Sequence, residues 1–242
     1  VVHEKLRGTP DAALIKAYLA QVAANKPYVL WSDETYIDRA VTSQDDDTLY
    51  PRFAARFDPH APERDAKPEP LEAALAREKK LVLLGEPGIG KTTSLLHLAW
   101  QAAQPCEGSQ PSQDFPREIP IYVELKYYNG EPELETLLAR RVNDILRATN
   151  LMLDPDSNKH TEILQKWLAQ SDAHFLLLVD GLNEVRPEFH TAIRGALDAL
   201  LYTPHRIVIS CRGRDYDASL RDNAAAFVLQ GLQADEIRDY LQ

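Results

Sequence analysis

Residues 81–93 read LVLLGEPGIGKTT, and this segment decides the fold of the chain. Its first four residues are apolar, and so short an apolar run predicts a strand that is buried on both faces. A glycine-rich turn follows, and the residues after it predict a helix. Gly85, Gly90, Lys91 and Thr92 have the spacing G-x-x-x-x-G-K-[ST], which is typical of a phosphate-binding loop, or P-loop.

This P-loop predicts a site for the phosphates of a nucleotide. Glycines let successive backbone N–H groups turn inward around a phosphate, and the following helix adds its positive dipole end. We expect Lys91 to contact the β- and γ-phosphates, and the Thr92 hydroxyl to ligate Mg²⁺. A chance glycine loop is the alternative, but strand, full motif and helix occur here in the required order. The residues expected to contact the phosphates are Gly85, Glu86, Pro87, Gly88, Ile89, Gly90, Lys91, Thr92 and Thr93.

The composition is that of an ordinary globular protein, with 44% hydrophobic and 26% charged residues among 242. The net charge of −10 argues against a general nucleic-acid-binding surface. No apolar run approaches the roughly 20 residues that span a bilayer, and the N-terminus lacks the apolar core of a signal peptide. Cys106 and Cys211 are far apart, so we expect two free thiols and a cytoplasmic location. The missing initiator Met indicates a piece of a longer protein.

Strands alternate with helices after residue 70, which predicts a parallel sheet covered on both faces. Residues 1–70 are expected to form a leader that packs on this domain, with a helix at 11–24 and a short strand within 28–37. Asp45, Asp46 and Asp47 lie in its polar second half, where a solvated loop is the simpler interpretation than a metal site. The expected later strands are 81–84, 121–125, 175–180, 206–210 and 226–229, and the expected helices start at 71 and cover 94–100, 133–147, 162–169, 187–201 and 234–242.

Polar residues follow these strands at the edge where ligands bind in parallel sheets. Asp180 ends the apolar run FLLLVD, and this is the Walker B pattern, in which the carboxylate holds Mg²⁺. Glu184 is the candidate to polarise the water that attacks the γ-phosphate. The alternatives are a strand-end aspartate that starts a turn before Gly181, and a solvated Glu184.

The fourth strand is followed by a basic segment, Arg212-Gly213-Arg214. If this strand lies between the P-loop strand and the Asp180 strand, its tip lies next to the γ-phosphate. A charge-assisted contact there distinguishes a triphosphate from a diphosphate. We choose Arg212 for this sensor, with Ser210 as the weaker candidate. Arg214 is a further alternative, and both arginines being solvated loop residues is the simplest one.

Several patterns are absent. Guanine-specific GTPases carry N-K-x-D, and neither Asn-Lys pair, at residues 25–26 and 158–159, is followed by that Asp. No segment reads L-S-G-G-Q, which disfavours a transporter ATPase. The seven histidines are scattered without a pair at metal-ligand spacing.

These segments together resemble the NACHT family of signal-transducing P-loop ATPases, relatives of the AAA+ group. The resemblance covers about residues 71–242, and the Asp-Gly-x-x-Glu form of Walker B is distinctive of that family. The family often has a second acidic residue where this chain has Asn183, which bears on the rate of hydrolysis more than on nucleotide binding. The segments that carry it are GEPGIGKTT (85–93), LLLVDGLNEV (176–185), IVISCRGRDY (207–216) and FVLQGLQADEIRDYL (227–241).

The resemblance implies a three-layer α/β P-loop NTPase domain over 71–232. Its five-stranded parallel sheet would have the order second, third, fourth, first, fifth strand, and 233–242 would begin a helical subdomain. In relatives, residues just before the domain pack near the adenine, which implies base-side contacts from Tyr36 and Ile37.

The resemblance also implies an ATP/ADP switch that needs Mg²⁺. Bound ADP would hold a closed monomer, and ATP with a sensed ligand would permit self-association. Effector and sensor domains of the same protein would flank the nucleotide domain, and family members act in innate immunity and in bacterial antiviral defence. A scaffold that keeps ADP without hydrolysing ATP is the second hypothesis. A small-molecule kinase is disfavoured because no lid-like arginine cluster follows the helices.

Overall fold

The computed structural model describes residues 10–44, 67–104, 118–131, 134–146, 175–216, 220, 222–234, 236 and 238. The expected helix at 162–169, the acidic run 45–47 and Cys106 lie outside these residues. Cys211 is buried and forms no disulfide bond with another described residue.

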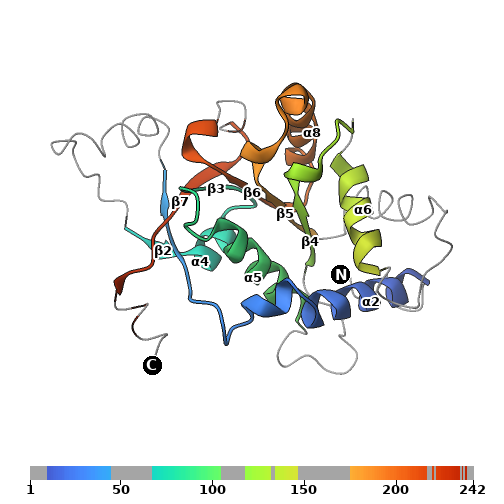
Figure 1. The fold of residues 1–242 in the computed structure, drawn as a ribbon, viewed down its shortest axis with the longest axis horizontal. Coiled ribbons are helices and arrows are strands. Elements are labelled where there is room, and N and C mark those ends of the chain that lie inside the picture. Colours follow the sequence, from blue (N-terminus) through green and yellow to red (C-terminus); the bar gives the residue numbers. More distant parts are fainter. Residues whose placement is uncertain are drawn as a thin grey trace.

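A single mixed sheet of seven strands forms the centre of the described structure, in the order β2-β1-β7-β3-β6-β5-β4 (Figure 1). The expectation of a five-stranded, all-parallel sheet is wrong, because two strands of the expected leader extend it in antiparallel pairing. The other five strands are parallel, and their order along the sheet is second, third, fourth, first, fifth. The strands are β1 (Ala40–Ser43), β2 (Glu69–Pro70), β3 (Lys80–Leu84), β4 (Ile119–Glu124), β5 (Phe175–Asp180), β6 (Arg206–Cys211) and β7 (Ala225–Leu229).

The central strands are apolar along their length because both faces of the sheet are covered. Every residue of β5 is buried, as are all residues of β3 and β6 except the first. Pro120 lies near the start of β4, which is tolerated because β4 is the edge strand. In Figure 1, α5 lies below the sheet and α8 above it. The helices are α2 (Pro10–Ala24), α4 (Leu71–Arg77), α5 (Lys91–Ala103), α6 (Leu134–Leu146) and α8 (His190–Leu201).

The N-terminal segment is built into the domain. The helix expected at 11–24 is confirmed as α2, which contacts α5 and α6 through a buried face that includes Ile15 and Tyr18. The hydroxyl of Tyr18 donates to the carbonyl of Pro120 at 2.7 Å. The strand expected within 28–37 is wrong: Tyr28–Trp31 forms the 3₁₀ turn η1, and the N–H of Val29 bonds to the carbonyl of Asn25.

The part of the chain that the structure describes has four further 3₁₀ turns, which follow strands or precede a helix. They are η3 (Leu125–Tyr127), η4 (Leu182–Glu184), η5 (Pro187–Phe189) and η6 (Gly213–Asp215). The helix expected over 187–201 therefore begins as η5 and continues as α8. None of the described helices is both long and apolar enough to cross a bilayer.

Candidate functional site

The loop between β3 and α5 has a backbone that requires glycine. Gly88 and Gly90 have φ angles of +79° and +108°, a region that side chains with a Cβ rarely adopt. A Cβ at Gly85 would lie 2.8 Å from Cγ2 of Ile89, so Gly85 is also needed, for close packing. The loop therefore curls tightly into α5, whose first N–H groups have no partner within the helix. This geometry fits an anion at the start of α5.

Lys91 reaches back across the loop. Its Nζ donates to the carbonyl oxygens of Gly85 at 2.7 Å and Glu86 at 3.0 Å. Burial lowers the pKa of the Lys91 ammonium; nearby Asp180 raises it, and Arg212 lowers it further. The three side chains are thus within electrostatic reach of one another. A phosphate oxygen is a stronger acceptor than a carbonyl, so Lys91 is suited to exchange one for the other.

Asp180, at the tip of β5, joins three parts of the site through hydroxyl groups. Its Oδ2 accepts from Thr92 at 2.8 Å and from Tyr122 at 3.0 Å, and its Oδ1 accepts from Ser210. Ser210 Oγ also accepts the N–H of Gly181 at 2.8 Å. The carboxylate is buried, and in this low-dielectric environment each of these hydrogen bonds is stronger than it would be in water. Thr92 and Asp180 together offer the hard oxygen ligands that Mg²⁺ prefers, so this pair fits the ion.

Sequence reasoning missed Tyr122. It lies in the expected second strand, and although the implied strand order puts that strand beside the third, the sequence does not show which of its side chains faces Asp180. Burial raises its pKa, and the charge of Asp180 raises it further, so its hydroxyl stays protonated and donates. Ser210, chosen as the weaker sensor, contacts Asp180 directly. Arg212 follows β6 and is partly buried.

Replacing Tyr122 with Phe is expected to lower the free energy of unfolding by about 1–3 kcal/mol, because a hydrogen bond to a charged group is lost while the ring is kept. Chemical denaturation of the two proteins measures this difference. Tyr202→Phe is the control, since Tyr202 is 77% exposed. Equal stability of Tyr122→Phe and the parent would show that the Tyr122–Asp180 bond contributes nothing.

Glu184 lies at the end of η4, four residues after Asp180. Its N–H bonds to the carbonyl of Gly181 at 2.8 Å, and a Cβ at Gly181 would lie 3.1 Å from its carboxyl carbon. Gly181 has a φ of +79°, which turns the chain sharply after β5. The Glu184 side chain therefore folds back toward the strand tip while remaining exposed to solvent.

Arg39 is a second residue that sequence reasoning missed. Its Nη2 donates to the carbonyl of Ile89 at 2.8 Å and to that of Gln230 at 2.5 Å. A Cβ at Gly90 would lie 3.1 Å from its Nη1. The side chain is buried, and desolvation lowers its pKa. Arg39 thus ties the segment before β1 to the P-loop and to the chain after β7.

Replacing Arg39 with Met is expected to weaken nucleotide binding about tenfold and to lower stability by about 1–3 kcal/mol, because the P-loop carbonyl of Ile89 loses its charged donor. Calorimetric titration with ATP and chemical denaturation measure the two effects. Arg77→Met is the control, since Arg77 is exposed and bonded to Glu69. Parent-like values for Arg39→Met would contradict a role for Arg39 in holding the loop.

The two residues expected on the base side lie in different settings. Tyr36 is buried, its hydroxyl donates to Ser94 Oγ at 3.0 Å, and its ring stacks on His97 with centroids 3.8 Å apart. Burial raises the pKa of Tyr36 to about 12. Ile37 is partly exposed. Tyr36 therefore holds the N-terminal segment against α5, and base contact by Tyr36 or Ile37 remains a prediction.

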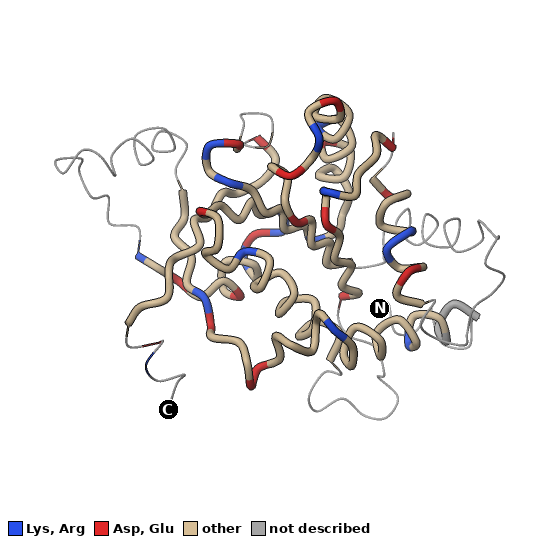
Figure 2. Tube along the Cα trace, viewed as in Figure 1, with Lys and Arg blue, Asp and Glu red and all other residues tan. Residues whose placement is uncertain are grey.

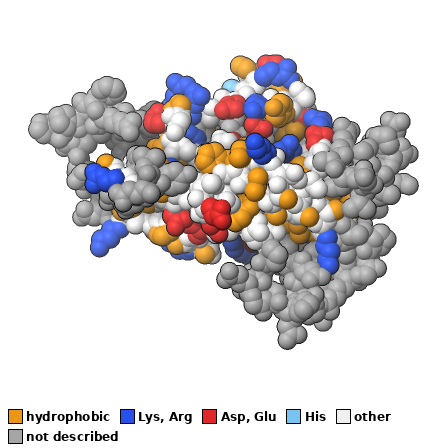
Figure 3. Space-filling model, turned by 60° about the horizontal axis from the view of Figure 1, so that its bottom comes forward, with side chains coloured by type: hydrophobic (Ala, Val, Ile, Leu, Met, Phe, Trp, Pro, Cys, Tyr) orange, Lys and Arg blue, Asp and Glu red, His pale blue; other side chains and the backbone are white. Residues whose placement is uncertain are grey.

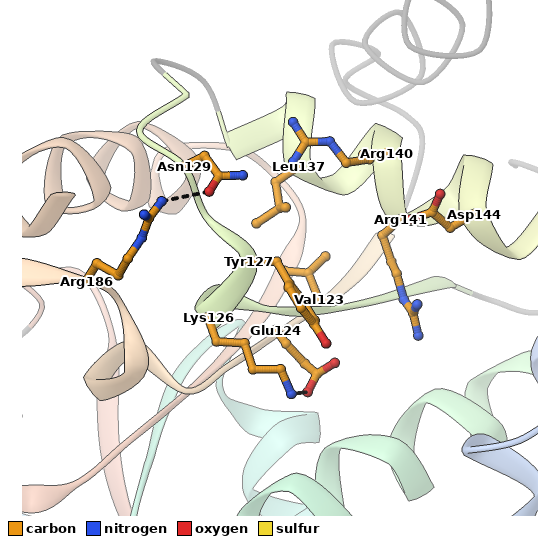
Figure 4. A pocket seen from close by; sticks show the side chains of 10 residues that line it. All are labelled: Val123, Glu124, Lys126, Tyr127, Asn129, Leu137, Arg140, Arg141, Asp144 and Arg186. Carbon is orange, nitrogen blue, oxygen red and sulfur yellow. Dashed lines mark hydrogen bonds and ion pairs between the residues drawn. The ribbon is translucent and has the colours of Figure 1, made fainter.

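A cavity of about 490 Å³ lies beyond the tip of β4 (Figure 4). None of the predicted site residues lines it. Figure 4 shows Arg186 and Asn129 on one side, the α6 side chains on the other, and the Lys126–Glu124 ion pair below them. Glu124 is the register partner of Asp180, so this cavity adjoins the site without including it. Its lining is Val123, Glu124, Lys126, Tyr127, Asn129, Leu137, Arg140, Arg141, Asp144 and Arg186.

A known protein family matches the larger part of the chain. No curated protein matches the chain. The family model described as the NACHT domain matches residues 79–242, which is more than half of the chain and includes the P-loop, Asp180 and Arg212. The chain therefore belongs to the NACHT family and contains its nucleotide-binding, P-loop NTPase-type domain.

Proposed function

We propose that the chain binds ATP with Mg²⁺ and hydrolyses it slowly, as the switch domain of a larger signalling protein. The observation that carries this proposal is the 2.8 Å hydrogen bond between Thr92, at the start of α5, and Asp180, at the tip of β5. It brings the Walker A hydroxyl and the Walker B carboxylate to one point, with Lys91 beside them. Family membership supports nucleotide binding.

The roles of the side chains follow from their chemistry. The glycine loop and Lys91 would bind the phosphates, and Thr92 with Asp180 would hold Mg²⁺, which neutralises phosphate charge when bound. Tyr122 and Ser210 orient the Asp180 carboxylate through their hydroxyl groups. The Glu184 carboxylate would orient and polarise the attacking water, since it lies beside the turn that follows Asp180.

Arg212 would sense the γ-phosphate. It follows β6, which lies between β3 and β5 in the sheet, and its charge acts on Lys91. A guanidinium in this position favours a triphosphate over a diphosphate through a charge-assisted contact. We therefore propose that ATP and ADP hold the residues after β6 differently, and that this difference permits self-association in the cytoplasm, under control of effector and sensor domains in the same protein.

A non-hydrolysing scaffold that keeps ADP is the second candidate. Asn183 favours it, because an amide stands where the family often has a second acid, and so does the solvent exposure of Glu184. In that case bound nucleotide would act through stability: at 100 times its dissociation constant a ligand adds about 2.7 kcal/mol.

Phosphate release by purified full-length protein, with its activating ligand present, separates the two candidates. The switch predicts slow release that requires Mg²⁺, together with a larger particle in light scattering with ATP than with ADP. The scaffold predicts bound ADP and no release. Phosphate transferred to another molecule instead of water would contradict both and indicate a kinase.

A further inference from the structure

Away from the P-loop, an imidazole and two carboxylates from separate elements converge. His97 lies on α5, Glu72 in the first turn of α4, and Asp38 in the segment before β1. One ligand atom of each lies within 4.8 Å of those of the other two. Figure 2 gives the charged positions along the trace, and Figure 3, turned so that the bottom of Figure 1 comes forward, shows acidic side chains gathered on this face.

His97 is oriented as a metal-ligating histidine is. Its Nδ1 lies 2.8 Å from the carbonyl oxygen of Trp31, which can only accept, so Nδ1 carries the hydrogen. In the neutral ring this leaves the lone pair on Nε2. Stacking on Tyr36 fixes the ring plane, and the side chain is only 3% exposed. A backbone carbonyl that fixes one ring nitrogen while the other binds the ion is the usual arrangement around protein-bound metals.

Within the described part of the chain, Nε2 has no hydrogen-bond partner. The nearest charged atom is Oδ1 of Asp33, at 3.8 Å. The buried Nε2 thus has a carboxylate oxygen as its nearest charged neighbour, and a carboxylate oxygen is an acceptor too. A cation between them would satisfy all of these atoms at once.

The carboxylates have no cation of their own among the described residues. Neither Asp38 nor Glu72 forms an ion pair there, although Arg39 is adjacent in sequence. The Arg39 guanidinium bonds to Ile89 and Gln230 instead. Two negative charges held this close repel each other unless a counter-ion lies between them.

We propose that His97 Nε2, Asp38 and Glu72 bind a divalent first-row transition-metal ion, with Zn²⁺ as the best fit and water completing its coordination. One imidazole with carboxylates is a donor set that suits Zn²⁺. Zn²⁺ ligands lie about 2.0–2.2 Å from the ion, so the ligand atoms must approach slightly. Rotation of the exposed Asp38 side chain and of the partly exposed Glu72 supplies this movement.

The ion would fasten three elements together. Asp38 belongs to the N-terminal segment that pairs with β7, Glu72 to α4, and His97 to the helix that begins at the P-loop. Zn²⁺ is therefore a structural clamp between the middle of α5, α4 and the segment before β1, separate from the Mg²⁺ pair of Thr92 and Asp180. This proposal stands whether or not the chain hydrolyses ATP.

Calorimetric titration of ZnCl₂ into metal-free, nucleotide-free protein tests it. We expect one equivalent of Zn²⁺, bound at least about tenfold more weakly by Asp38→Asn and by Glu72→Gln. Glu135→Gln is the matched control, because Glu135 also lies in the first turn of a helix and is partly buried. Asp180→Asn is the control for the P-loop site. Both controls should bind Zn²⁺ with the affinity of the parent.

His97→Gln removes a buried side chain, so its folding must be checked by circular dichroism before its affinity is compared. The two carboxylate variants keep the test decisive if it does not fold. The proposal is overturned if the parent binds no stoichiometric Zn²⁺, if either carboxylate substitution leaves the affinity unchanged, or if Asp180→Asn alone removes binding.

Discussion

Replacing Lys91 with alanine is expected to abolish measurable ATP binding, which corresponds to a loss of at least about a hundredfold in affinity. The ammonium lies at the P-loop, held by the carbonyls of Gly85 and Glu86, and is the cation best placed for phosphate oxygens. Hydrogen bonds to a charged group are worth about 1.5–3 kcal/mol each, and two of them account for a hundredfold, since each 1.4 kcal/mol is a factor of ten. Calorimetric titration with ATP and Mg²⁺ measures the change.

Lys79→Ala is the matched control, because Lys79 is an exposed lysine just before β3, the strand that leads into the P-loop. It should bind ATP as the parent does. Lys91 is half-buried, and no carboxylate among the described residues bonds to its Nζ. Its removal should therefore leave the fold intact, which circular dichroism checks. Parent-like ATP affinity in Lys91→Ala would contradict the nucleotide site.

Replacing Glu184 with glutamine is expected to leave ATP affinity within about twofold and to reduce phosphate release at least about a hundredfold. The amide keeps the size of the side chain but cannot take up a proton, and general base catalysis contributes about 10²–10⁴ in rate. The loss should appear in the turnover number at saturating ATP, measured in the activated full-length protein.

The control is Glu188→Gln. Glu188 is an exposed carboxylate in η5, the 3₁₀ turn that comes after η4 in the chain. It should turn ATP over at the parent rate. If Glu184→Gln hydrolysed ATP normally, the attacking water would have to be activated by another group. If the parent itself released no phosphate, the scaffold would be the better account.

The strongest local patterns in the sequence predicted most of the sheet. The apolar run ending in Asp180 gave β5 with the bounds that the structure has, because a strand covered on both faces must be apolar throughout. The glycines of the P-loop predicted the tight turn into α5 for a similar reason, since Gly88 and Gly90 hold backbone angles that other residues avoid.

The parts that were missed depend on contacts between distant segments. β1 is only four residues long and pairs with β7, which lies almost at the other end of the chain, so no local period marks it. The aromatic residues of Tyr28–Trp31 favour strands by propensity, but their surroundings fold them into a 3₁₀ turn. Tertiary contacts therefore override the strand propensity of these residues.

The same reason explains the site residues that were missed. Tyr122 reaches Asp180 because β4 lies beside β5. Arg39 reaches the P-loop because β1 pairs with β7, and β7 in turn lies beside β3, the strand that leads into the P-loop. Both look unremarkable in sequence, one in an apolar run and the other in a polar segment. The residues at the ends of recognisable motifs were predictable, whereas those that support them from other strands were not.

The most direct test of the nucleotide site is to identify what the purified protein retains. Mass spectrometry after denaturation should find an adenine nucleotide, ATP or ADP, close to one per chain in the parent and none in Lys91→Ala. A guanine nucleotide in the parent, no nucleotide even after incubation with ATP and Mg²⁺, or equal amounts in both proteins would contradict the account.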